Sequence, residues 1–274
     1  MLLLERLFPM VEPTPSPKVD TTVPQSARIW NYWLGGKDNF AVDREAGDAF
    51  AAMSPGVFDL AKQSRKFLIQ AVTYLAAEAG IRQFLDIGTG LPTMENTHEV
   101  AQRVAPDSRI VYVDNDPLVL VHARALLTNT TDEGVTDYLD ADYHDTDQIL
   151  ADARNILNFT KPIAVMFMGV LGHVADDDEM RSIVARVMAA VPSGSYLVLW
   201  DGTDTSEAQV TAAEDYKDTG AVPYIVRSPE QIGRCFEGLE MVEPGLVSIS
   251  QWRLDPADAE AKPVDGYGAV ARKP

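Results

Sequence analysis

The feature that most constrains the fold is an alternation between strand-like and helix-like segments across residues 83–201. The segments of strand length are QFLDIG, RIVYVD, VTDYLDAD, PIAVMFMGV and SYLVLWD, and helical periodicity separates them. Most of these strands are apolar nearly throughout, which is typical of a parallel sheet covered by helices on both faces. We therefore predict an α/β fold with a Rossmann-like, mostly parallel sheet.

The C-terminal end breaks this alternation. LEMVEPGLVSISQW and YGAVARK resemble two strands joined by a polar loop, with no helical pattern between them. Such a connection favours antiparallel pairing, because a parallel crossover needs a dozen or more residues, usually a helix. We expect these two strands to close one edge of the sheet.

The N-terminal part differs in composition from the rest. Residues 11–25 contain four prolines with several serines and threonines, so we predict a flexible tail over 1–25. The aromatic segment SARIWNYWLGGKDNF follows, and then helical patterns over DREAGDAFAAM and from Phe58 to Ala79, ended by Gly80. We predict a helical cap or lid over 26–80 and the ligand-binding sheet domain over 81–274.

Charge and cysteine content exclude several classes of partner. The chain has 41 acidic and 23 basic residues, a net charge of −18, which repels phosphate backbones and argues against a nucleic-acid partner. The lone Cys235 allows no internal disulfide and no zinc set, so we expect no metal and a cytoplasmic location. No apolar stretch approaches the roughly 18 residues of a membrane helix, so no membrane partner is expected.

Polar groups and glycines follow the first strands where they end. The first strand leads into Asp86-Ile87-Gly88-Thr89-Gly90, and glycines there let a ligand approach the backbone. A simple strand–helix turn is the alternative interpretation.

Asp114 ends the second strand, 24 residues after Gly90, where a carboxylate can accept hydrogen bonds from ribose hydroxyls. Asp142, after the third strand, could meet an adenine amino group or cap the next helix.

The loop chemistry discriminates between nucleoside cofactors. An NAD fingerprint requires a third glycine where Thr93 stands, and Pro92 intervenes. The Asp86 carboxylate would repel a pyrophosphate but attract a ligand that carries an ammonium and a sulfonium. The loop therefore favours S-adenosylmethionine over NAD.

The motifs FLDIGTG, VYVDNDP, YLDAD and AVMFMGVLGHVADDDEM resemble the successive motifs of class I S-adenosylmethionine-dependent methyltransferases. The segments ARIWNYWLGGKDNFAVDREAGD and RQFLDIGTGLPTMENTHEVAQ resemble more closely a bacterial S-adenosyl methyltransferase family, once a domain of unknown function. The likeness runs from about residue 24 to the C-terminus. It implies a seven-stranded sheet with one antiparallel strand near the edge. Leu91-Pro92 departs from the class, which often has another glycine there.

This resemblance implies a cofactor site and assigns roles within it. The methionine moiety would lie along the first loop, the ribose on Asp114, the adenine beside Asn115 and Asp142, and the sulfonium region near Gly169 at the fourth strand. The implied residues are Asp86, Gly88, Thr89, Gly90, Asp114, Asn115, Asp142 and Gly169.

The acceptor side is less sharply defined. His173 follows the fourth strand and has an ordinary pKa suited to a general base, although a structural histidine is the alternative. Asp201, at the end of the fifth strand, is a second candidate for the base or a turn residue. Tyr216, after the fifth strand, is a candidate for the substrate pocket, as is Tyr224.

The aromatic N-terminal segment is a candidate lid. We expect Tyr32 to contact the cofactor and Trp30 and Trp33 to contact the substrate, with Phe40 beside them; a helix packed on the core is the alternative. Arg28 or Lys37 could pair with the cofactor carboxylate.

Taken together, the sequence predicts an S-adenosylmethionine-dependent methyltransferase with a small-molecule methyl acceptor. A regulatory protein that binds the same cofactor without turnover is the first alternative. An NAD-dependent oxidoreductase is the second.

Overall fold

The centre of the molecule is one mixed β-sheet, with eight strands in the part of the chain that the structure describes. The computed structural model describes residues 19–92, 95–126, 128–254 and 261–274. The strand order is β3-β2-β1-β4-β5-β8-β6, and β7 also pairs with β8. The strands are β1 (Gln83–Ile87), β2 (Arg109–Asp114), β3 (Val135–Asp140), β4 (Ala164–Met168), β5 (Tyr196–Gly202), β6 (Glu240–Met241), β7 (Val247–Ser248) and β8 (Gly266–Arg272). Strands β1 to β5 are parallel and β8 is antiparallel to β5, which confirms the predicted architecture.

The extra strand relative to the expected seven comes from the C-terminal part of the chain. The segment expected as one strand over LEMVEPGLVSISQW is divided into β6 and β7, which pair with different parts of β8. Pro244 lies between the two pieces in a tight turn, which is closed by a hydrogen bond of 2.8 Å from the N–H of Gly245 to the backbone oxygen of Val242 and has Gly245 at a φ of +83°, so the strand is interrupted there.

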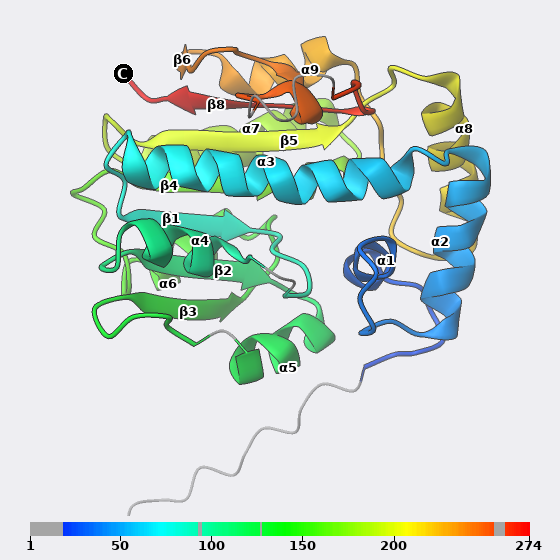
Figure 1. Ribbon diagram of the computed structural model, residues 1–274, viewed down its shortest axis with the longest axis horizontal. Coiled ribbons are helices and arrows are strands. Elements are labelled where there is room, and N and C mark those ends of the chain that lie inside the picture. The colour runs from blue at the N-terminus through cyan, green and yellow to red at the C-terminus, as the bar shows by residue number, and fades with distance from the viewer. Residues whose placement is uncertain (1–18, 93–94, 127, 255–260) are drawn as a thin grey trace, which may run out of the picture.

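Helices cover both faces of the sheet. They are α1 (Ser26–Trp33), α2 (Ala41–Met53), α3 (Val57–Ala77), α4 (Thr97–Val104), α5 (Pro117–Leu126), α6 (Thr146–Ala153), α7 (Asp177–Ala190), α8 (Glu207–Tyr216) and α9 (Pro229–Gly233). Helices α3 and α4 pack on one face, and α6 and α7 pack on the other. In Figure 1, α3 crosses in front of the sheet. None of the described helices is both long and apolar enough to span a bilayer.

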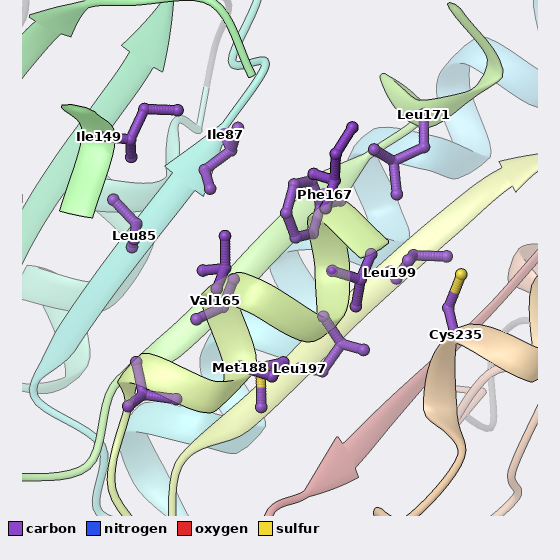
Figure 2. Close-up of a cluster of buried hydrophobic side chains, with 14 of the residues drawn as sticks. Leu85, Ile87, Ile149, Val165, Phe167, Leu171, Met188, Leu197, Leu199 and Cys235 are labelled. Carbon is purple, nitrogen blue, oxygen red and sulfur yellow. The ribbon is translucent and has the colours of Figure 1, made fainter. Parts of the chain in front are cut away.

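Each central strand contributes to both cores, because successive side chains point to opposite faces. Leu85, Val165 and Leu197 are register partners on neighbouring strands and point into the core under α7, as Figure 2 shows. Phe84 points to the other face, toward α3. Cys235 is buried in the first core, where burial raises the pKa of its thiol to about 12 and keeps it protonated.

Helix α3 matches the expected element closely. The helical pattern from Phe58 to Ala79 rests on residues that recur at helical spacing, and all of them are buried in the structure: Leu60, Ser64, Phe67, Leu68, Ala71, Val72 and Leu75. Gly80 follows the helix with a φ of +71°, a backbone conformation that disfavours residues with a Cβ. Packing of these buried apolar residues on the sheet joins α3 to the sheet core.

Helices α1, α2 and α8 form a third cluster at the carboxyl ends of the parallel strands. Figure 1 shows the arrowheads of β1, β2, β3 and β5 pointing toward this cluster, and β4 runs parallel to β1 and β5. Residues 1–18 of the expected tail lie outside the described residues. Residues 19–25 contact the cap, because Arg28 on α1 donates to the backbone oxygen of Asp20 at 2.8 Å.

Candidate functional site

A cavity of about 410 Å³ lies beyond the carboxyl ends of β1 to β4, under α1. Its volume falls in the range of small-molecule sites, roughly 300–1,000 Å³. Most of the residues expected at the site line it, namely Trp30, Asp86, Gly88, Thr89, Gly90, Asp114, Asn115, Asp142, Gly169 and His173. The fold therefore brings together side chains that are far apart in the sequence.

Asp86, near the end of β1, is the most deeply buried carboxylate of the cavity. It is 2% exposed, and its Oδ2 accepts a hydrogen bond of 2.7 Å from the hydroxyl of Thr97. Its Oδ1 has no hydrogen-bond partner among the described residues. Burial raises the pKa of Asp86 to about 6, against the opposing effects of Thr97 and of the Arg65 guanidinium. A cationic ligand group would satisfy the unpaired oxygen and favour the ionised carboxylate.

The loop after β1 exposes its backbone to the cavity. Gly88 and Gly90 both have positive φ, +75° and +69°. A Cβ at Gly88 would overlap the side chain of Val170, whereas a Cβ at Gly90 would meet nothing within 4 Å. Gly90 therefore borders open space in the cavity, where a ligand can reach the main chain.

The tips of β2 and β3 carry the polar groups expected to meet ribose and adenine. Asp114 accepts backbone hydrogen bonds from Gly90 at 2.7 Å and from Asp116 at 3.0 Å, and burial raises its pKa. Each carboxylate oxygen keeps a second lone pair for a ligand hydroxyl. Asn115 donates to Asp142 at 2.9 Å, so these two residues form one polar edge of the cavity.

Gly169 at the tip of β4 brings the backbone close to an indole ring. Its φ is +81°, and a Cβ there would lie 2.6 Å from Cζ2 of Trp200. Trp30 from α1 packs against Trp200 edge to face, with ring centroids 5.7 Å apart. The tip of β4 is therefore enclosed by aromatic groups, one of them supplied by the cap.

His173 lies between the cavity and the cap, and its hydrogen bonds define its tautomer. Nδ1 is 2.9 Å from the backbone oxygen of Pro223, and Nε2 is 2.9 Å from the hydroxyl oxygen of Ser26. A carbonyl oxygen only accepts hydrogen bonds, so Nδ1 carries the proton and Nε2 accepts from Ser26. Burial lowers the pKa of His173, which keeps the ring neutral near pH 7.

Asp201, the other candidate for the base, does not line the cavity. It is buried at the end of β5, where its carboxylate accepts hydrogen bonds from the hydroxyl of Tyr224 and the backbone of Gly202. Burial raises its pKa to about 6.

A second, smaller cavity of about 30 Å³ adjoins the first and shares Ser26, Trp30 and His173 with it. Trp33 and Tyr216, both expected to contact substrate, line this second cavity. Tyr32, expected to contact the cofactor, lines neither cavity, and its hydroxyl donates to Asp48 at 2.6 Å.

The cationic residue of the cavity is one that sequence reasoning missed. Arg28 is buried in an ion pair of 3.1 Å with Asp43, and Lys37 is exposed, so neither lines the cavity. Arg65 on α3 does line it and donates to the backbone oxygen of Glu95 at 2.7 Å. The helical pattern gives no signal for Arg65, because consecutive residues of a helix point about 100° apart and Arg65 therefore lies beside, not on, the apolar face that contains Ser64.

The charges of the cavity fit S-adenosylmethionine. Its described lining contains four aspartates and one arginine, namely Asp86, Asp114, Asp116, Asp142 and Arg65. An acidic lining attracts an ammonium and a sulfonium, whereas it repels a pyrophosphate. The unpaired oxygen of Asp86 supplies the acceptor that an ammonium needs.

Two solved structures resemble this chain over nearly its whole length. A DUF574 family protein from Streptomyces avermitilis is 43% identical, with a TM-score of 0.90 over 94% of this chain and 100% of its own. A candidate methyltransferase from Thermobifida fusca is 40% identical, with a TM-score of 0.84 over 96% of this chain and 99% of its own. No curated protein matches the chain.

The match to a protein family agrees with the chemistry of the cavity. The S-adenosyl methyltransferase family matches residues 12–274, which include the cap, the sheet and both cavities. This match and the acidic cavity at the strand ends support the same cofactor. The chain therefore belongs to the S-adenosyl methyltransferase family and uses S-adenosylmethionine as its methyl donor.

Proposed function

We propose that this methyltransferase acts on a small molecule, held next to the cofactor at the junction between the two cavities. The observation that carries the proposal is the convergence of four strand ends and the cap helix α1 on one acidic cavity of about 410 Å³. A cavity of this size, with the aromatic rings of Trp30 and Trp200 in its wall, suits a small acceptor better than a polymer. The net charge of −18 also disfavours a nucleic-acid acceptor.

Each group of the cavity has a proposed role toward the cofactor. Asp86 would accept a hydrogen bond from the ammonium, and Arg65 would pair with the carboxylate. Asp114 would bind the ribose hydroxyls, while Asn115 and Asp142 would bind the adenine. When bound, S-adenosylmethionine supplies an electrophilic methyl group beside the tip of β4.

His173 is the proposed general base. Its Nε2 has no proton in the neutral ring and lies at the junction of the two cavities, which are the properties that proton removal from an acceptor requires. Trp30, Trp33 and Tyr216 would exclude water from this region and orient the acceptor. We also propose a cytoplasmic location, consistent with a lone cysteine buried as a thiol.

Equilibrium binding tests the cofactor part of this proposal. Isothermal titration calorimetry of the full chain should show binding of S-adenosylmethionine and S-adenosylhomocysteine and none of NAD. Trp30 and Trp200 line the cavity, so tryptophan fluorescence should change on binding. Tight binding of NAD without either adenosyl ligand would reverse the conclusion.

Turnover separates an enzyme from a regulatory protein that only binds the cofactor. The full chain, supplied with S-adenosylmethionine and a bacterial metabolite extract, should release S-adenosylhomocysteine faster than the Asp114→Ala variant does. Binding without any release above that variant would favour the regulatory alternative.

A further inference from the structure

Ser26 occupies a position between the cap and the proposed base. It is the first residue of α1 and lines both cavities. Its hydroxyl oxygen lies 2.9 Å from Nε2 of His173. Because Nδ1 of that ring donates to Pro223, the Ser26 hydroxyl must be the donor in this contact.

The neighbouring polar groups of the small cavity are engaged elsewhere. The indole N–H of Trp33 donates to the backbone oxygen of Gly47, and the hydroxyl of Tyr224 donates to Asp201. The Tyr224 ring also packs edge to face on His173, at 5.1 Å between centroids. These side chains contribute aromatic rings to the cavity wall, whereas Ser26 contributes a hydroxyl that donates to the unprotonated Nε2 of His173.

The nearby charged side chains Asp201 and Arg28 do not take part in the Ser26–His173 contact. Asp201 on β5 lies beyond Tyr224, which separates it from His173. Arg28, the charged residue of α1, is paired with Asp43 on α2. The Ser26–His173 contact is therefore set between neutral groups, and the space beside it holds only about 30 Å³. An acceptor atom would have to approach it from the large cavity, which both residues also line.

Building on the proposed function, we propose that Ser26 is a catalytic proton relay and that the acceptor carries a hydroxyl or N–H at the atom that is methylated. As the bond from that atom to the methyl carbon forms and the sulfur–methyl bond breaks, the acceptor proton passes to Oγ of Ser26. The original Ser26 proton passes to Nε2 of His173. The products are a methylated acceptor, a neutral thioether, an unchanged serine and a histidine imidazolium, so the positive charge of the sulfonium ends on His173.

A chromogenic phenol tests the relay without knowledge of the natural acceptor. The full chain saturated with S-adenosylhomocysteine is titrated with 4-nitrophenol at a pH where the free phenol is mainly protonated. The phenolate form has its own absorption band. We expect bound 4-nitrophenol to ionise in the wild type and ¹⁵N spectra to show a proton arriving on Nε2 of His173. Ser26→Ala should reduce the phenolate signal at least about tenfold, while Ser26→Thr should retain it.

Ser54→Ala is the matched control for a purely structural role. Ser54 also makes a buried hydrogen bond in the cap, 2.9 Å to Gln209 on α8, but does not contact His173. This variant should keep the phenolate signal, and all variants should keep their affinity for S-adenosylhomocysteine.

Several results would overturn the relay while leaving the proposed function intact. These are an absence of phenolate in the wild type despite bound S-adenosylhomocysteine, an equal signal in Ser26→Ala, and an equal loss in Ser54→Ala. A proton found on Nε2 in the free protein would overturn it as well. Failure of the wild type to bind S-adenosylhomocysteine would instead contradict the proposed function, and the relay with it.

Discussion

Oδ2 of Asp114 accepts a hydrogen bond of 2.7 Å from the backbone N–H of Gly90. This bond joins the tip of β2 to the glycine loop that follows β1. The residue proposed to bind the ribose therefore also holds the loop along which the methionine moiety would lie. Loss of the carboxylate should affect both ends of the cofactor at once.

Asp114→Ala is expected to weaken S-adenosylmethionine binding by at least about tenfold. A hydrogen bond to a charged group contributes roughly 1.5–3 kcal/mol, and about 1.4 kcal/mol corresponds to a tenfold change in affinity. Calorimetric titration measures the change. Asp137→Ala, at an exposed position of β3, should leave the affinity as it is. Equal affinities for the Asp114 variant and the wild type would remove this residue from the site.

The raised pKa of Asp86 predicts a pH dependence of cofactor binding. Its folded pKa of about 6 lies above the ordinary 3.8, so its ionisation destabilises the folded protein as the pH rises from about 4 to 6. A bound cation favours the carboxylate, so affinity should increase about tenfold between pH 5 and 7. The pKa of Asp201 is also raised to about 6, but Asp201 does not line the cavity. Its ionisation should therefore change the stability of the fold and not the affinity for the cofactor.

Asp86→Asn provides the comparison for this pH series. The neutral amide cannot ionise, so its affinity should be lower than that of the wild type at pH 7 and nearly independent of pH. A wild-type affinity that stays flat between pH 5 and 7 would show that the Asp86 carboxylate does not contact the cationic end of the cofactor.

Much of the fold is visible in the sequence because each central strand is buried on both faces. A short apolar run such as AVMFM in β4 predicts a strand that helices cover on both faces. The buried residues of α3 recur at helical spacing, which predicts the helix. The C-terminal segment is harder, because its pairing partner β8 decides where it forms a strand. Two residues on each side of Pro244 pair with β8, and two-residue pairings leave no periodicity to detect.

Some site residues can likewise be predicted from the sequence, and others cannot. Gly88, Asp114 and Asp142 follow strands that run in the same direction, so their convergence at one edge follows from topology alone. Tyr32 and Arg65 depend on how the cap and α3 are oriented, which the local pattern does not encode. Tyr32 turns toward Asp48 in the neighbouring helix, and Arg65 turns into the cavity from a helix otherwise recognised by its apolar residues.

Arg65 should account for recognition of the cofactor carboxylate. Arg65→Met is expected to weaken binding of S-adenosylmethionine at least about tenfold, the effect of losing a charge-assisted hydrogen bond. Decarboxylated S-adenosylmethionine, which lacks that group, should bind the variant and the wild type with similar affinity. Arg103→Met is the control, because Arg103 also contacts Glu95 but is exposed and does not line the cavity. A uniform loss for both ligands would mean that Arg65 acts on the structure of the site.

Truncation tests the contribution of the cap. Deletion of residues 1–20 should leave cofactor binding intact, because Arg28 keeps its hydrogen bonds to Asp43 and to the backbone of Val23. Deletion of residues 1–40 should abolish binding, because it removes the whole of α1, and with it Trp30, Asn31 and Leu34, from the cavity lining. Circular dichroism checks that each truncated chain folds. Equal binding by both truncated chains would contradict the role of the cap.

A comparison of two glycines with similar positive φ tests whether the cofactor occupies the space beside Gly90. Gly90 and Gly80 have φ of +69° and +71°, and a Cβ at either would meet nothing within 4 Å. Gly90→Ala and Gly80→Ala should therefore lower the free energy of unfolding by similar amounts, about 1–2 kcal/mol from the left-handed conformation. Only Gly90 lines the cavity, so only Gly90→Ala should also lose affinity for S-adenosylmethionine, by at least about tenfold. Denaturant titration and calorimetry separate the two effects, and an unchanged affinity in Gly90→Ala would place the cofactor away from the glycine loop.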